Sequence, residues 1–225
     1  MRTKLLLTVS AALAAAALAS SVQAATNLVA NGDFTAGPSG FTSDYGFSPG
    51  NGVPPAVYDV GTNPNAIHPS WASFGDHTTG TGNMLIVNGS ETPGAIIWGE
   101  NGLSVEANTT YYFSTWIAST YPTSPAELDF SINGVAIGPT FTASTTTGDW
   151  QLFQASWNSG ASTTANIALV NQNLAFNGND FALDDIGLST APAGVPEPAS
   201  WALMLAGFTG LGAMLRRRRA ALALA

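Results

Sequence analysis

The sequence predicts an all-β protein built as a sandwich of antiparallel sheets, and three observations carry that prediction. Short runs of β-branched and aromatic residues alternate with polar residues between Gly, Asn and Asp. No stretch between the two chain ends spaces apolar residues at a helical period over three turns. Charged residues are only 9% of the chain, and Ser, Thr, Asn and Gly supply most of its polarity. Many short strands with such turns are typical of a sandwich.

The first 24 residues have the three parts of a secretory signal peptide. Arg2 and Lys4 give it a charged start, residues 5–19 form an apolar run, and residues 22–24 read as a small-residue cleavage site. We therefore expect a signal helix over residues 1–24 and export by the general secretion machinery. The mature chain is expected to begin at the next residue.

Residues 25–190 are predicted to form one domain, which is long enough to bury a core of its own. The chain has no cysteine, so neither disulfides nor thiol chemistry can contribute. Residues 37–82 are rich in Gly, Pro and Asn and are expected to form loops. These loops carry six aromatic residues: Phe41, Tyr45, Phe47, Tyr58, Trp71 and Phe74. Such rings either cover one open end of the sandwich or build a binding site.

The clearest local pattern is a β-hairpin in the second half of the domain. Residues 128–132 alternate apolar and polar side chains, Asn133-Gly134 is a favoured hairpin turn, and residues 135–137 continue the alternation. The same reasoning predicts strands at 84–87, 95–98, 111–118, 150–157, 164–170 and 181–188.

The charge of the domain is of one sign. All six basic residues lie at positions 2, 4 and 216–219, whereas residues 26–194 carry thirteen Asp and Glu and no Lys or Arg. Such a domain repels phosphates and attracts divalent cations, which excludes nucleic acid as a partner. A strongly anionic polysaccharide is also disfavoured as a direct ligand unless calcium bridges the two.

Residues 191–225 are organised as a membrane tail. A linker, 191–198, ends in Val195, Pro196, Glu197 and Pro198, and the uncharged residues 199–215 follow. As a helix this segment measures about 25 Å, the low end of what crosses a bilayer. The tail 216–225 begins with Arg216, Arg217, Arg218 and Arg219. Because basic residues beside a span stay in the cytoplasm, we expect a transmembrane helix with the domain outside.

This tail resembles the PEP-CTERM sorting signal, in which a Pro-Glu-Pro motif, a short hydrophobic helix and a basic cluster end an exported bacterial protein. The resemblance implies that an exosortase, a membrane protease-transpeptidase, recognises the tail and cleaves it near Pro-Glu-Pro in bacteria that make extracellular polysaccharide. The protein would then be anchored transiently in the inner membrane and pass to the cell surface or extracellular matrix. An ordinary anchor that is never cut is the alternative.

Three segments of the domain resemble galactose-binding-like carbohydrate-binding modules, near the family 4/9/22 type. They are the opening NLVANGDF at 27–34, the middle runs 82–88 and 103–116, and the closing FALDDIGL at 181–188. The resemblance implies a jelly-roll sandwich of two antiparallel sheets whose first and last strands lie side by side.

The same resemblance implies a structural calcium ion where these two strands meet. Asp184 and Asp185 match the acid of the last strand, and Asp33 lies in the opening segment. Two carboxylates and loop carbonyls would supply enough oxygen ligands for calcium. The glutamate that the family places after Phe34 is Thr35 here, which removes one ligand. Alternatively, Asp184 and Asp185 simply end a strand in solvent.

Sugar binding in this fold rests on aromatic rings that stack on sugar faces. The candidates for sugar binding are aromatic residues that lie beside Gly or Pro in expected loops or at strand ends. They are Trp71, Trp98, Tyr45, Tyr58 and Tyr121. Trp71 and Trp98 are the first candidates. Trp116, Trp150 and Trp157 fall within strand patterns and are expected in the core.

Enzyme chemistry finds little support in the sequence. His68 and His77 are the only histidines, and no nucleophile elbow, zinc-spaced cluster or phosphate loop is present. A glycosidase pair such as Glu91 with Glu100 is conceivable, but spacing alone cannot place it. We therefore expect a non-catalytic protein that binds extracellular polysaccharide, or else a purely structural matrix protein that makes protein contacts and has no sugar site.

Overall fold

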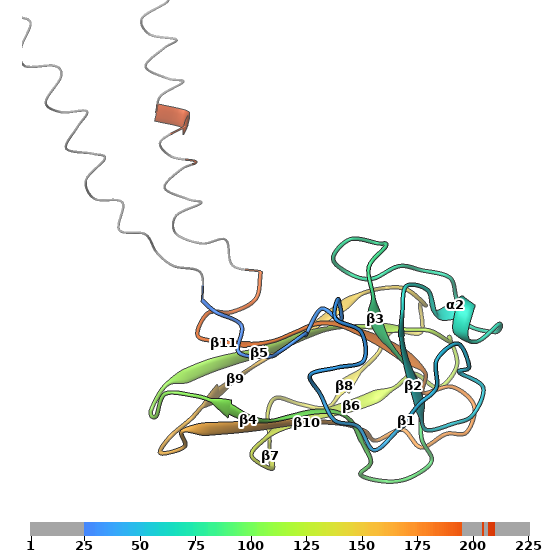
Figure 1. Ribbon diagram of the computed structural model, residues 1–225, viewed down its shortest axis with the longest axis horizontal. Coiled ribbons are helices and arrows are strands. Elements are labelled where there is room, and N and C mark those ends of the chain that lie inside the picture. The colour runs from blue at the N-terminus through green and yellow to red at the C-terminus, as the bar shows by residue number, and fades with distance from the viewer. Residues whose placement is uncertain (1–24, 195–203, 205–206, 210–225) are drawn as a thin grey trace, which may run out of the picture. The chain divides into compact units, whose positions relative to one another are not determined.

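The computed structural model describes residues 25–194, 204 and 207–209 (Figure 1). Residues Thr26–Ala193 form one compact unit that contains every strand described below. The predicted signal peptide, the Pro-Glu-Pro motif, the arginines and most of the predicted span lie outside the described residues. Residues 204 and 207–209 are helical, and the described part of the chain holds no helix with the length and apolar character needed to cross a bilayer.

The domain is a sandwich of two sheets, which Figure 1 shows stacked one above the other. The six-stranded sheet contains, in spatial order, β1 (Gly46–Phe47), β2 (Val57–Gly61), β3 (Met84–Asn88), β11 (Phe181–Ser189), β5 (Thr110–Ser119) and β9 (Gln151–Asn158). The five-stranded sheet contains β4 (Ile96–Ser104), β10 (Thr164–Asn171), β6 (Glu127–Ile132) and β7 (Val135–Ala136), with β8 (Phe141–Thr142) also paired to β6. All pairs are antiparallel except β1 with β2.

The predicted hairpin is confirmed. Ile132 pairs with Val135, and the turn between them has the positive φ angles that its dipeptide tolerates, 52° at Asn133 and 75° at Gly134. The other predicted strands correspond to β3, β4, β5, β9, β10 and β11 within a few residues at each end, although β4 extends to Ser104.

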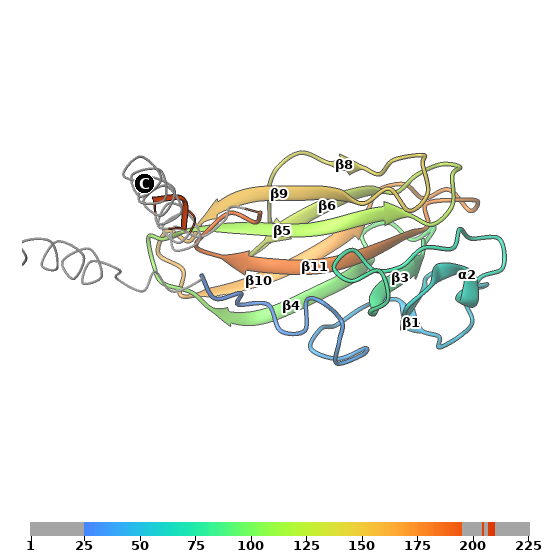
Figure 2. The ribbon, with the colours of Figure 1, turned by 90° about the horizontal axis from the view of Figure 1, so that it is seen from above.

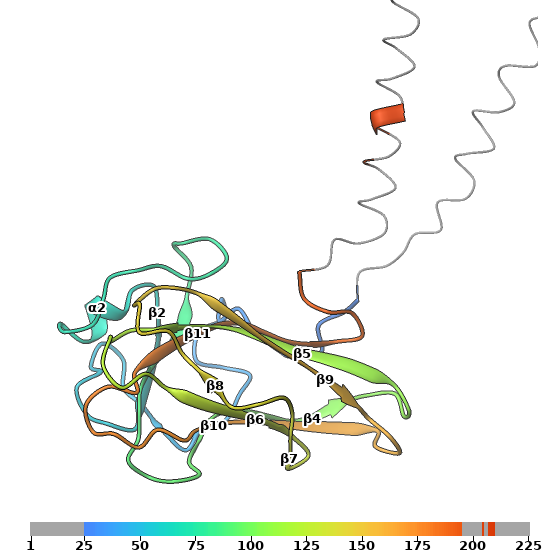
Figure 3. The ribbon, with the colours of Figure 1, turned by 180° about the vertical axis from the view of Figure 1, so that it is seen from behind.

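Three short strands were not predicted. The first two, β1 and β2, lie in the region 37–82 that the sequence presents as loops, and β8 has two residues. Strand β2 forms because Val57–Gly61 pairs antiparallel with β3, a long-range contact that local Gly and Pro content does not reveal. The single helical turn α2 (Pro64–Ile67) follows β2 and lies at the same end of the sandwich (Figure 3).

Apolar side chains fill the space between the sheets. Phe130 of β6 and Phe153 of β9 stack across it with ring centroids 4.1 Å apart, and Phe113 of β5 packs against both. Strand alternation sends the intervening residues outward. On the outer face of the six-stranded sheet, Ile86 and Ala182 therefore belong to a second, smaller apolar cluster. The loop that carries α2 covers this cluster and so orders one end of the domain.

The opening segment runs alongside β11, as Figure 2 shows. Leu28 donates its backbone N–H to the carbonyl of Leu188 at 2.9 Å, and Ile186 donates to Gly32 at the same distance. The implied adjacency of the first and last segments is therefore present. Strand β11 has a bulge between Asp184 and Gly187, where its pairing with β5 shifts register.

Gly32 permits this close approach, since a Cβ built on it would lie 2.0 Å from the carbonyl oxygen of Ile186. We expect Gly32→Ala to push the opening segment off β11 and lower the free energy of unfolding by about 1–3 kcal/mol. Gly46→Ala is the matched control, because its Cβ would come no closer than 3.8 Å to a neighbour. Chemical denaturation measures both, and equal stability of the two variants would contradict the packing argument.

Candidate functional site

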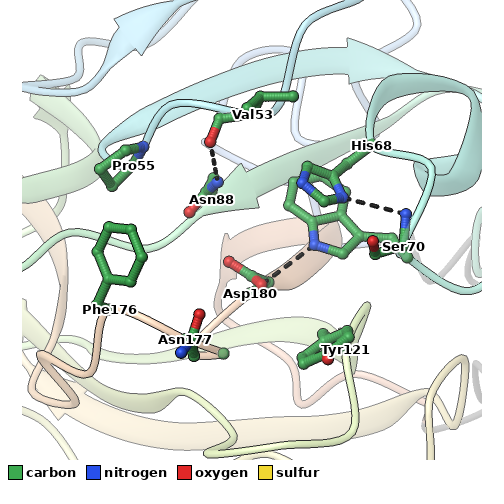
Figure 4. Close-up of a pocket in the computed structure, with 11 residues that line it drawn as sticks. Val53, Pro55, His68, Ser70, Asn88, Tyr121, Phe176, Asn177 and Asp180 are labelled. Carbon is green, nitrogen blue, oxygen red and sulfur yellow. Dashed lines mark hydrogen bonds between the residues drawn. The ribbon is translucent and has the colours of Figure 1, made fainter.

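A pocket of about 210 Å³ lies at the end of the six-stranded sheet where β3 and β5 finish and β11 begins (Figure 4). Five stretches of loop and strand end contribute to it. Its lining residues are Val53, Pro55, His68, Ser70, Trp71, Asn88, Tyr121, Phe176, Asn177, Gly178 and Asp180. The mixture of rings, amides and one carboxylate resembles small-ligand sites, where a few polar groups orient a ligand held against apolar walls.

Asp180 is the acidic group of this pocket, and only 7% of its surface is exposed. It directly precedes β11. Its Oδ2 accepts a hydrogen bond from Trp71 Nε1 at 3.1 Å, and its Oδ1 accepts one from the Gly89 backbone N–H at 3.3 Å. Burial disfavours the charged form and raises the pKa of Asp180 to about 6, although both hydrogen bonds oppose that shift.

Aromatic side chains line the same pocket as this carboxylate. Phe176 is 65% exposed and Tyr121 is partly exposed. In Figure 4 Asp180 lies between their rings. Trp71 is buried and stacks on His68 at 4.8 Å, so it holds Asp180 through its N–H and does not offer an open face. Phe176 and Tyr121 therefore offer accessible rings, and the ring of His68 is partly exposed as well.

Hydrogen bonds to the backbone fix the polar side of the pocket. Asn88 ends β3 and donates Nδ2 to the carbonyl of Gly52 at 2.7 Å, which ties the loop before β2 to the rim. His68 Nδ1 accepts from the Ser70 N–H at 3.2 Å, so this ring nitrogen carries no proton there. With rings, amides and a carboxylate around one small space, the pocket can stack on a ligand and hydrogen-bond to hydroxyl or amine groups.

The five aromatic residues predicted to bind sugar fall in three places. Trp71 and Tyr121 line the pocket. Tyr58 packs between Phe41 and Phe47, with ring centroids 5.6 Å and 5.4 Å away, and is partly exposed. The remaining two, Trp98 and Tyr45, are buried.

Trp98 and Tyr45 therefore require a correction. Trp98 is 1% exposed because it pairs with Leu169 on the core-facing side of the sheet, and its ring stacks on Phe41. Tyr45 is also buried, and burial raises its pKa to about 12. Neither ring presents a face to a ligand in this structure.

Sequence reasoning missed Phe176, Asn177 and Asp180. All three lie in the connection between β10 and β11, where the chain reads FNGND from Phe176 to Asp180. Asn177-Gly178 is a turn signal. Phe176, an aromatic residue beside this turn, meets the criterion by which Trp71 was selected, an aromatic ring in an expected loop. The contact between Asp180 and Trp71 joins residues 109 positions apart, so local pattern gave no sign of it.

A second cluster forms around the bulge in β11, where His77, Asp184 and Asp185 place ligand atoms within 4.8 Å of one another. His77 Nδ1 lies 2.8 Å from Asp185 Oδ2, and its backbone N–H donates to Asp184 Oδ2 at 2.9 Å. The imidazole also stacks on Trp116 at 3.8 Å. The predicted pair Asp184 and Asp185 thus has a histidine against it.

Asp33 lies in the opening segment, outside the group formed by His77, Asp184 and Asp185. It is exposed, and its Oδ1 accepts from the backbone N–H and the hydroxyl of Thr35. Together with Asp185 it lines a shallow depression of about 290 Å³ between the opening segment and β11. Asp185 is therefore the residue common to the depression and the histidine cluster.

These residues fit calcium in part. Asp184 and Asp185 offer carboxylate oxygens, which calcium prefers, whereas the imidazole of His77 is a ligand for transition metals. Both oxygens of Asp184 already accept backbone N–H groups, from His77 and from Asp185. Burial, followed by the charge of Asp185, raises the pKa of Asp184 to about 7. A cation held there would stabilise the ionised form.

Both buried aspartates make the stability of the domain depend on pH. Burial raises the pKa of Asp180 to about 6 and that of Asp184 to about 7, above the ordinary aspartate value of 3.8. Between about pH 4 and pH 8 these two carboxyl groups bind more protons in the folded state than in the unfolded state. Their contribution to stability is therefore full below about pH 4 and is lost as pH rises toward 8.

We therefore expect a thermal midpoint several degrees higher at pH 5 than at pH 8 in EDTA, measured by circular dichroism. Asp180→Asn should reduce the fall of the thermal midpoint in the lower part of this pH range. Glu106 is an exposed carboxylate at the opposite end of β5, so Glu106→Gln should leave the fall unchanged. A midpoint that rises from pH 5 to pH 8 would contradict the assignment.

Comparison with known proteins identifies the tail. Residues 194–219 match the model of the PEP-CTERM protein-sorting motif. The sequence matches no curated protein.

Solved structures that resemble the domain include carbohydrate-binding modules. The CBM22-1 xylan-binding domain of Xyn10C from Paenibacillus barcinonensis is 14% identical, and the match covers 76% of this chain and 98% of that chain with a TM-score of 0.49. A CBM4 structure is 14% identical over 72% of this chain and 99% of that chain, with a TM-score of 0.40. The C-terminal domain of EclA, a sugar-binding protein, is 18% identical over 42% of this chain and 66% of that chain, with a TM-score of 0.39.

The tail thus carries the sorting motif that its Pro-Glu-Pro, apolar and basic segments suggested, and the motif indicates an exported protein that is processed at the membrane. This chain is an all-β sandwich that bears a PEP-CTERM protein-sorting motif.

Proposed function

We propose that this protein is an exported carbohydrate-binding protein of the cell surface or extracellular matrix. Its apolar segment at 199–215 would hold it transiently in the inner membrane until an exosortase cleaves the tail near Pro-Glu-Pro. The released part is a jelly-roll domain that binds extracellular polysaccharide without catalysis. The sorting motif supports the route of export, and the pocket at Asp180 supports the binding activity.

The observation that carries the binding proposal is the arrangement of Phe176 and Tyr121 about Asp180. Two accessible rings beside a hydrogen-bonded carboxylate offer a sugar both the stacking surface and the acceptor that it needs. The pocket is smaller than the roughly 300–1,000 Å³ that drug-sized ligands occupy, so it suits a single sugar residue. A polymer would run across the rim and place one residue in the pocket.

The binding role is proposed as non-catalytic. A glycosidase needs two carboxyl groups on either side of the bond that breaks, and the residues that line this pocket include one. Of the pair considered from sequence, Glu91 is exposed, and Glu100 accepts a hydrogen bond from the Ala30 N–H on the opening segment. Neither contributes to the pocket at Asp180.

A purely structural matrix role is the second candidate, and one observation favours it. Trp98, Tyr45 and Trp71 are buried, so most of the rings selected from sequence serve packing. Under this alternative Phe176 and the exposed Val53 on the pocket rim would contact another protein. The binding experiment below separates the two candidates.

We further propose that calcium binds at the bulge of β11. Asp184 and Asp185 would hold the ion, with Asp33 contributing from the neighbouring opening segment. The ion would tie the first and last segments of the domain together. It would also provide the positive charge that no Lys or Arg supplies between residues 26 and 194.

We expect the purified protein to bind the extracellular polysaccharide of its own bacterium with saturable heat in calorimetry. Phe176→Ala should weaken that binding about threefold to tenfold, because it removes the exposed ring of the pocket, and Tyr121→Ala should act in the same direction. Phe47→Ala is the matched control, since Phe47 is also exposed but does not line the pocket. Absence of heat with this polysaccharide would overturn the binding proposal and favour the structural role.

We expect calcium at tenfold its Kd to raise the thermal midpoint at pH 8 by about 3–6 °C. Asp185→Asn should abolish the rise because it removes a proposed ligand, whereas Glu106→Gln should retain it. Equal midpoints of the wild-type protein in calcium and in EDTA would eliminate the calcium proposal without affecting the pocket at Asp180.

A further inference from the structure

The pocket at Asp180 also indicates which class of sugar it takes, an inference that rests on the proposed carbohydrate-binding function. We propose that the sugar residue in this pocket carries a free, protonated amine, as a hexosamine does when it lacks its N-acetyl group.

Asp180 has no positive partner in its own domain. Its two hydrogen-bond donors, Trp71 Nε1 and the Gly89 N–H, are both neutral. No Lys or Arg exists between residues 26 and 194. His68 lines the same pocket, but its Nδ1 accepts a hydrogen bond and its ring stacks on Trp71. A buried carboxylate without a counter-ion is costly, and a ligand ammonium group would remove that cost.

The aromatic rings favour the same kind of ligand. The faces of Phe176 and Tyr121 carry negative potential, so a pocket lined by these rings and a carboxylate attracts a cation. Figure 4 shows Asp180 between these two rings, with Asn177 beside it. Because all three residues line one small pocket, an ammonium group near the carboxylate would also lie near the two rings.

Other sugar classes fit this pocket less well. A uronic acid would bring a second negative charge to Asp180 in a domain that carries thirteen acidic residues and no Lys or Arg. A neutral hydroxyl can donate to Asp180 but leaves its charge uncompensated. An N-acetyl group is neutral as well, and it adds bulk at the position where the ammonium would meet the carboxylate. The free amine is the substituent that satisfies both the charge and the space.

The test uses three β-1,4-linked tetrasaccharides that differ only at carbon 2 of each ring. These are the tetramers of glucosamine, N-acetylglucosamine and glucose, which carry an ammonium, an acetamide and a hydroxyl group. Calorimetry with the purified protein at pH 7 and low salt should give a Kd for the glucosamine tetramer about tenfold to hundredfold lower than for the other two. Higher sodium chloride should weaken this preference, because the attraction is between charges.

Two variants assign the preference to the pocket. Asp180→Asn should abolish the advantage of the glucosamine tetramer, because it removes the charge while keeping a side chain of the same shape. Glu106→Gln makes the same change in net charge at the opposite end of β5 and should retain the advantage, which excludes a general effect of the acidic domain. The thermal midpoint of each variant verifies that it is folded.

The outcomes separate this inference from the proposed function. Equal affinity for the three tetramers, or tighter binding of the acetylated one, would overturn the amine assignment and leave carbohydrate binding in place. Preference for the amine that survives Asp180→Asn would overturn the assignment to this pocket. If none of the tetramers binds while the native polysaccharide does, the amine assignment fails alone; if the polysaccharide does not bind either, the proposed function fails with it.

Discussion

The absence of Lys and Arg between residues 26 and 194 is the constraint on which the rest of the domain depends. Four carboxylates are buried, those of Asp59, Asp76, Asp180 and Asp184, and none can form an ion pair with Lys or Arg. Each is held by N–H groups instead. Asp59 accepts from the backbone of Gly50 and Val60, and the other three accept from loop or strand-end N–H groups. The loops are thus ordered around buried carboxylates, to which their backbone N–H groups donate hydrogen bonds in place of water.

The number and quality of those donors decide the state of each acid. Burial disfavours the charged form of Asp76, but the N–H groups of Thr79 and Gly82 outweigh it and the pKa is lowered. Asp180 and Asp184 have fewer or poorer donors for their degree of burial, and their pKa values are raised. Asp180 and Asp184, whose charged forms the fold stabilises least, lie at the two proposed binding positions, the pocket and the bulge of β11. This is the pattern expected of sites where a ligand completes the local charge balance.

Local sequence information accounted for the strands and for little of the site. The hairpin at Asn133-Gly134 could be predicted because turn chemistry and alternation act within ten residues. Trp98 was misplaced because its orientation follows from pairing with Leu169, which lies on another strand far along the chain. Asp180 was not selected because its role arises from contact with Trp71 across the fold. The metal candidates Asp184 and Asp185 followed from a resemblance, whereas the position of His77 against them required the fold itself.

The place of β11 has a mechanical consequence. This strand runs in the interior of the six-stranded sheet, bonded to β3 on one side and to β5 on the other, and the opening segment lies against it as well. It is also the last strand before the C-terminal tail. Tension applied through that end would enter the domain along β11 and would load its hydrogen bonds to both neighbouring strands in shear at the same time. An edge strand, by contrast, can be peeled away by breaking its hydrogen bonds one after another. A domain held by its C-terminus in a flowing or contracting matrix would resist unfolding better in this arrangement than if its last strand lay at an edge.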